Sequence, residues 1–240
     1  GSDKDKINTL RRISFVIYSC KRDTFGKEFE DIKSKAKELL SGNEENMKLK
    51  DEIFLMMRVL FLRFSHEGVM KMIKDLWPII FMELLQNIEN EKRYKDTDLV
   101  IESFKFIELL SLANVEEFTL DQWIFILDTY DINNLDTRNE KSILSNLLKD
   151  KSKIFKPIAI KFLKRLGDTN VTDDLLKTKN KGKSELYIKP SKGDLSELKN
   201  SVKKFVYSIL DMNTYKVPVN YDQIEDIIEN DFLDIKIFNK

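Results

Sequence analysis

The sequence predicts an all-α protein of about ten amphipathic helices, arranged as a bundle or as a degenerate HEAT-like stack of helix pairs. Apolar residues recur at spacings of three and four along nearly every segment, which is the helical period. Glycine and proline are scarce, with 7 and 4 among 240 residues, so few positions favour tight turns. Hydrophobic residues make up 42% of the chain, enough for the core of one domain over residues 3–240.

The N-terminal third contains three apolar stripes. Residues 7–17 predict the first helix, and residues 25–39 predict a second that Gly42 ends, as glycine commonly does past a helix C-terminus. Residues 48–64 are apolar on most sides. We therefore expect this third helix to lie at the centre of the fold.

Proline complicates the next segment, residues 67–90. Pro78 has no backbone N–H to donate and disfavours helical backbone at Trp77, so we expect a kink or a restart there. Residues 96–112 predict another helix that is apolar on most faces.

Two capping boxes predict helix starts further along the chain. Thr119-Leu120-Asp121-Gln122 is one, and Thr137-Arg138-Asn139-Glu140 is the other. The remaining helices are expected at residues 154–166, 195–212 and 221–230.

Composition argues against several classes of function. The chain has 41 Lys+Arg and 41 Asp+Glu, so we expect no nucleic-acid partner held by overall charge attraction. Cys20 and His66 are the only residues of their kinds, which argues against a metal site and against histidine-based catalysis. We expect no catalytic residue, no cofactor and no metal. A hydrolase or lyase acting through carboxylates is the alternative, and it requires a deep pocket with two converging acids of perturbed pKa.

Any membrane contact is expected to be peripheral. The densest apolar run, Ile53–Phe64, carries Arg58 and Arg63 and is shorter than the roughly 20 apolar residues that a membrane-spanning helix needs. Gly1 and Ser2 are typical of the remnant left by cleavage of a tag, so we expect the natural chain to continue before them.

A basic segment is the first candidate binding site. Residues 151–166 contain no acid, and their apolar residues fall on one helical face. Such a helix can lie on an anionic lipid surface or on an acidic partner, or it can be a core-facing helix whose solvent face happens to be basic. The Lys-rich residues 177–194, predicted to be a mobile loop, could extend this patch. The candidate lipid-binding residues are Lys151, Lys153, Lys156, Lys161, Lys164 and Arg165.

A heptad-like stripe is the second candidate. Its spacing alternates three and four, as at the core positions of a coiled coil, although it spans fewer than three heptads. It predicts either packing within the chain or a helix–helix contact across a homodimer. The candidate contact residues are Leu195, Leu198, Val202, Phe205 and Ile209.

One stretch resembles a known family. The carrying residues from the first part of this stretch are Arg58-Val59-Leu60, Leu62-Arg63, Ser65, Leu76-Trp77-Pro78 and Glu83-Leu84-Leu85-Gln86. Phe104–Leu109 and the aromatic run Gln122-Trp123-Ile124-Phe125 follow in the same order. The chain thereby resembles the C-terminal region of the Dopey family of large membrane-traffic proteins, best over residues 53–128.

The resemblance implies a role. Dopey proteins are scaffolds on Golgi, trans-Golgi network and endosome membranes. For this chain, the resemblance implies a cytoplasmic, peripheral location. It also implies a large partner related to Arf guanine-nucleotide exchange factors, and an aminophospholipid flippase as a second partner. It also implies self-association and phosphoinositide binding. An unrelated helical-repeat adaptor for a cytosolic protein is the alternative.

Two groups of family-motif residues carry structural expectations. Arg58 and Arg63 lie inside an apolar helix, so each should pair with a carboxylate or with carbonyls, and Glu83 is a candidate partner. Trp77 and Trp123 are expected to anchor the core, with surface binding as the alternative.

Overall fold

The all-α prediction is confirmed. The computed structural model describes residues 2–42, 46–94, 96–126, 157–168, 188, 195–212 and 220–233. The helices of this part of the chain are α1 (Asp3–Ser19), α2 (Phe29–Ser41), α3 (Met47–Arg63), α4 (His66–Glu89), α5 (Glu91–Tyr94), α6 (Thr97–Leu112), α7 (Glu116–Phe125), α10 (Ile158–Arg165), α12 (Leu195–Met212) and α13 (Tyr221–Leu233).

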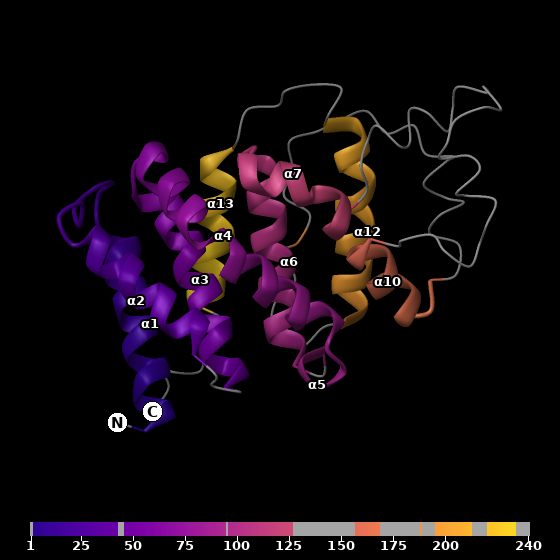
Figure 1. Ribbon diagram of the computed structural model, residues 1–240, viewed down its shortest axis with the longest axis horizontal. Helices are drawn as coiled ribbons and strands as arrows, with labels where there is room; N and C mark the ends of the chain where they lie inside the picture. Colours follow the sequence, from indigo (N-terminus) through magenta and orange to yellow (C-terminus); the bar gives the residue numbers. More distant parts are fainter. Residues whose placement is uncertain are drawn as a thin grey trace.

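The helices form two rows, which favours the helix-pair stack over the bundle. In one row α1 contacts α3 and α3 contacts α6, with α12 against α6. In the other row α2 contacts α4 and α4 contacts α7, with α10 against both α4 and α7. Figure 1 shows the pairs following one another along the long axis, from α1 and α2 to α10 and α12.

Helix α3 lies at the centre, as its apolar pattern predicts. Helices α1, α4, α6 and α13 all contact it, and every residue from Leu49 to Leu62 is buried. The Asn46 side chain accepts the backbone N–H of Leu49 and so caps the first turn. Burial on all sides explains why this helix carries an unbroken apolar run.

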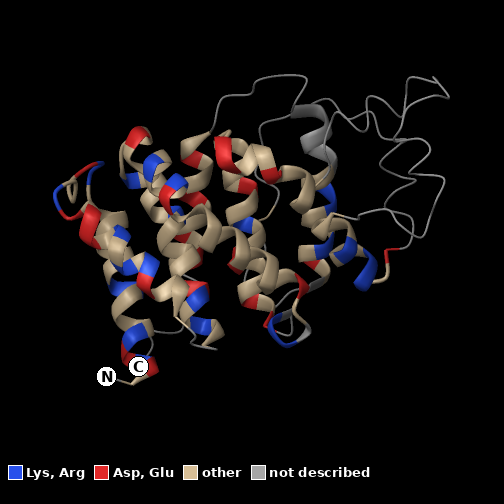
Figure 2. Ribbon diagram, in the orientation of Figure 1, with Lys and Arg blue, Asp and Glu red and all other residues tan. Residues whose placement is uncertain are grey.

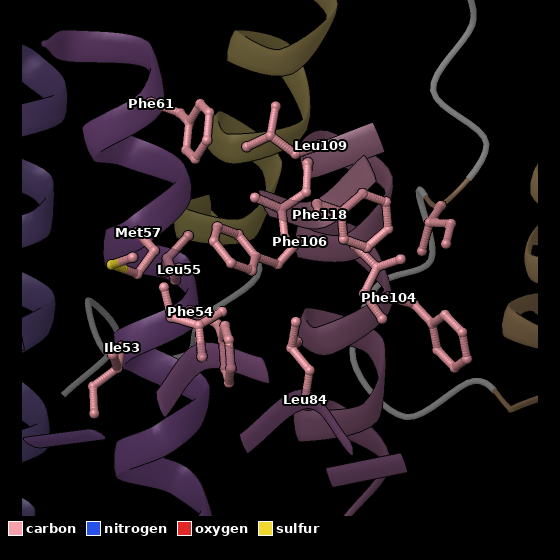
Figure 3. Packing of buried hydrophobic residues seen from close by; sticks show 14 of the residues in the cluster. Ile53, Phe54, Leu55, Met57, Phe61, Leu84, Phe104, Phe106, Leu109 and Phe118 are labelled. Carbon is pink, nitrogen blue, oxygen red and sulfur yellow. The ribbon is translucent and has the colours of Figure 1, made fainter. Parts of the chain in front are cut away.

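Aromatic side chains fill the space between α3 and α6. The Phe106 ring of α6 lies 5.5 Å from the Phe54 ring and 6.1 Å from the Phe61 ring, both of α3. Figure 3 shows Phe106 pointing into this space between the two helices. Phe104, two residues earlier, instead meets Phe162 of α10 at 4.8 Å.

Of the kink or restart predicted at Pro78, the restart is wrong, because α4 continues through this residue, and the kink stays a prediction. The missing N–H of Pro78 leaves the carbonyl of Lys74, four residues earlier, without its usual helical partner. Both residues are exposed, so water can satisfy that carbonyl. The helix therefore tolerates proline on its solvent side.

The capping box predicted at Thr119 is also wrong. Helix α7 begins at Glu116 after Val115, and the Thr119 hydroxyl lies inside the helix and donates to the Val115 carbonyl. Thr119 therefore has a local backbone partner one turn back, a bond that serine and threonine make within helices.

Other predicted elements agree with the structure or lie outside the described residues. Gly42 follows the end of α2, and the helix predicted over 195–212 is α12. The capping box at residues 137–140 and the loop at 177–194, apart from Ile188, lie outside the described residues.

Candidate interaction sites

A buried ionic network joins three helices that are distant in sequence. The Arg58 guanidinium of α3 donates to the Glu102 carboxylate of α6 at 2.5 Å and to the Asp231 carboxylate of α13 at 2.6 Å. Lys105 of α6 donates to the other Asp231 oxygen at 2.5 Å. All four residues are buried. The network holds α13 against α3 and α6 through a single carboxylate.

The charges in this network stabilise one another. Burial by itself lowers the pKa of Arg58, but Glu102 and Asp231 outweigh it and hold that pKa above its ordinary value. Burial raises the pKa of Asp231, but Arg58 and Lys105 outweigh it and hold that pKa below its ordinary value. Arg58 and Asp231 therefore remain charged near neutral pH.

A second contact holds the other end of α13. Arg63 forms an ion pair with Glu225 of α13, and its Nε donates to the Tyr18 carbonyl of α1 at 2.6 Å. At the Asp231 end of α13, the Phe232 ring lies 5.5 Å from the Phe15 ring and 5.4 Å from the Tyr18 ring of α1. Both arginines of the family motif thus contact α13.

Glu83 is not the partner of either arginine, which corrects the prediction. It accepts Lys50 of α3 at 2.6 Å and Arg93 of α5 at 2.8 Å. Glu83 lies on α4, whereas the acids that pair with the two arginines are Asp231 and Glu225 of α13 and Glu102 of α6. The prediction that each arginine is paired is nevertheless confirmed.

The basic segment is described only in part. Lys151, Lys153 and Lys156 lie outside the described residues, and Lys161, Lys164 and Arg165 lie on α10. Lys161 forms a 2.5 Å ion pair with Glu89, while Arg165 donates to the carbonyls of Ile88 and Glu89 at the end of α4. Lys161 and Arg165 therefore also hold α10 against α4. Figure 2 shows the basic positions of α10 in blue near one end of the stack.

Three positions of the heptad-like stripe of α12 pack within the chain, which agrees with the first of its two predicted roles. Leu198, Val202 and Phe205 are each 0% exposed. The side chains of Leu195 and Ile209 lie outside the described part of the structure. The three described positions are already covered by neighbouring helices, so they offer no surface to a second copy.

Two apolar pairs lie at the surface instead. Leu120 and Trp123 of α7 are 72% and 46% exposed, and Ile13 and Val16 of α1 are 44% and 50% exposed. Residues three apart share one helix face, so each pair forms a small apolar patch. The prediction that Trp123 anchors the core is therefore wrong.

Trp77 is buried at 8% exposure. Its indole N–H donates to Asp121 of α7 at 2.8 Å. The prediction that this tryptophan anchors the core is confirmed.

Two small cavities lie among the described residues. They have about 10 and 20 Å³ of space for water, room for roughly one molecule each. Neither is lined by two carboxylates. In the same part of the chain no His, Cys, Asp and Glu side chains gather as a metal site, and no helix is long and apolar enough to span a bilayer.

The acids of the buried network are not among the residues predicted from the sequence. Glu102, Lys105 and Glu108 interrupt the apolar pattern of α6 at intervals of three. Charges at such positions are a signal that a central helix faces an ionic partner. Asp231 gives no such signal, because it lies 173 residues from Arg58 and only folding brings them together.

Fold and surface together define the class: an all-α domain built as a stack of helix pairs, with a C-terminal helix held by buried ion pairs. The family model described as "DOP1 C-terminal" matches residues 2–204. The chain belongs to this family, the Dopey family, as the resemblance indicates.

Curated relatives agree with this assignment. "Protein DOP1" of Saccharomyces cerevisiae (strain ATCC 204508 / S288c) is 31% identical over 143 residues, covering 54% of this chain and 8% of the relative. "Protein dop1" of Emericella nidulans is 25% identical over 138 residues, covering 54% and 7%. The chain thus spans a small fraction of the length of these relatives. No solved structure matches the chain significantly.

Proposed function

We propose that this chain is a non-catalytic scaffold domain in membrane traffic between the Golgi and endosomes. Membership of the Dopey family, over residues 2–204, carries the proposal. By that membership, a large partner related to Arf exchange factors and an aminophospholipid flippase are the proposed partners. The relatives are many times longer than this chain, so the domain acts as one part of a larger assembly.

The form of the domain supports a binding role. A stack of helix pairs presents long surfaces to other molecules. The exposed apolar pairs on α1 and α7 are candidate contact points for a partner or for self-association, because apolar side chains gain most from being covered. The three described positions of the α12 stripe are buried and are not among these contact points.

A chimera of the Saccharomyces cerevisiae relative tests the trafficking role. The matching region of that protein is deleted or replaced by this chain, and recycling of a fluorescent cargo between endosomes and the Golgi is followed. Deletion should slow recycling, and replacement should restore it. Normal recycling after deletion would show that the region has no part in this traffic.

Recruitment to anionic lipid is the second part of the proposal, and α10 supplies its described cations. Lys161 and Arg165 also hold α4, so changing them alters packing as well as charge. Lys164 makes no ion pair with any described residue and is half-buried. Lys164 is therefore the position where a charge change reports on lipid rather than on packing.

Lys164→Glu should weaken binding to vesicles that contain phosphatidylinositol 4-phosphate. One basic group near an anionic surface contributes about 1 kcal/mol, so affinity should fall about fivefold or more. The measurement is vesicle flotation at low salt. Lys37→Glu, an exposed change on α2, is the matched control; equal losses in both variants would mean that α10 has no special role.

A further inference from the structure

Helix α13 is strongly acidic and amphipathic. Tyr221–Leu233 contains five acidic residues and no basic residue, namely Asp222, Glu225, Asp226, Glu229 and Asp231. Its apolar side chains are buried against the rest of the domain: Ile224, Ile227, Ile228 and Phe232. Amphipathic helices also bind other proteins by laying their apolar face into a hydrophobic groove.

Helix α13 covers a place on α3 and α6 where three basic side chains meet its acids. We call it the charged groove and define it by Arg58, Arg63 and Lys105, from α3 and α6. Asp231 of α13 meets Arg58 and Lys105, and Glu225 meets Arg63. Figure 1 shows α13 lying alongside α3 and α6, although it follows them by about a hundred residues or more in the chain.

The family model matches the residues of the charged groove but not helix α13. Arg58, Arg63 and Lys105 lie within the matched residues 2–204, and α13 lies after them. The family-matched part of the chain therefore supplies the three basic side chains of the charged groove, while the acids of α13 that meet them come from outside that part.

Electrostatics make the groove selective for an anionic helix. Glu102 is the other carboxylate that contacts Arg58 and Lys105 directly among the described residues. Glu108 lines the adjoining cavity, but it accepts the backbone N–H of Ile188. Without Asp231, two buried cations would share one contacting carboxylate, and an uncompensated buried charge is strongly unfavourable. Whatever replaces α13 must bring an acid to the same place.

We infer that the charged groove is a docking site for an acidic amphipathic helix of a partner protein, and that α13 is the chain's own occupant. A partner helix with acids six residues apart, flanked by Ile- and Phe-type side chains as in α13, competes with it. The inference deepens the binding role proposed above by naming the chemistry of the partner. A failure of docking would leave the trafficking role standing, because the chimera tests that role separately.

The test uses the full chain and a fluorescent peptide with the sequence of residues 220–233. Asp231→Asn in the chain weakens its own α13, so the intact peptide should bind this variant at least about tenfold more tightly than it binds the unchanged chain. Fluorescence anisotropy measures the affinity. A peptide that carries Asp231→Asn should bind neither chain.

Asp226→Asn is the matched control, because Asp226 lies on the same helix and is exposed. It should leave peptide affinity as in the unchanged chain. Equal peptide binding by the Asp226→Asn and Asp231→Asn chains, or no binding to a folded Asp231→Asn chain, would overturn the proposal.

Hydrogen exchange on the unchanged chain tests whether α13 can leave the charged groove, even if the Asp231→Asn chain fails to fold. An occupant that can leave must open without global unfolding, so α13 amides should exchange faster than those of α3. Identical protection of the two helices would show that α13 is an inseparable part of the core and would overturn the proposal.

Discussion

Arg58→Ala should lower the free energy of unfolding by about 3–5 kcal/mol, because it removes one side of a buried ion pair and leaves its acids uncompensated. The Arg58 side chain is 3% exposed, and those of Glu102 and Asp231 are 4% and 11% exposed. Lys105 still faces Asp231, but Glu102 keeps only a 3.7 Å contact with Lys105. Urea denaturation measures the loss.

A matched change on the surface separates this effect from the general loss of a long basic side chain. Arg12→Ala on α1 removes an exposed arginine and should change stability by no more than about 0.5 kcal/mol. Similar losses for the two variants would contradict the importance of the network.

A double variant tests whether the loss of stability comes from the carboxylate that Arg58→Ala leaves without its partner. Arg58→Met with Glu102→Met removes both charges and leaves the Lys105–Asp231 ion pair in place. Replacing both members of a buried pair by apolar groups is far less destabilising than breaking it. We expect a loss smaller than the sum of the single losses by about 0.5–3 kcal/mol. Strict additivity would mean that the two side chains do not interact.

The sequence predicts a helix well when the helix has one solvent-exposed face, as α1 has, or is buried on all sides, as α3 is. The stripe from Leu10 to Ile17 and the apolar run of α3 place two helices correctly, because periodicity reports directly which face is buried. Pro78 and Thr119 give wrong boundaries, because local signals for a helix end count for little when packing favours a continuous helix. Tertiary contacts decide such cases.

The partners of buried charges are less predictable than the charges themselves. The arginines in an apolar helix predict that acids must be near, and that is correct. Which acids they are depends on the stacking of helices: Glu83, 25 residues from Arg58, faces Lys50, while Asp231 reaches Arg58 from the far end of the chain. The α12 stripe shows the same limit, since its spacing is equally suited to a contact within the chain and to one between chains.

Phe106→Ala should lower the free energy of unfolding by about 3–5 kcal/mol, through lost burial and the cavity that remains. Phe106 is 0% exposed. It lies between Phe54 and Phe61 of α3, two helix turns apart, so no single neighbouring side chain can move to fill the space. The effect should appear in thermal and in urea denaturation alike.

Leu120→Ala is the control for apolar truncation, since Leu120 is 72% exposed, and it should change stability by no more than about 0.5 kcal/mol.

The joint position of Phe106 and Arg58 at the α3–α6 contact gives a further expectation. Phe106→Ala loosens the packing of α6 against α3, whereas Arg58→Ala also frees α13. Hydrogen exchange should therefore show lost protection in α3 and α6 for the first variant, and in α13 as well for the second. Equal loss of protection across α13 in both variants would mean that α13 depends on the α3–α6 packing as a whole rather than on its ion pairs.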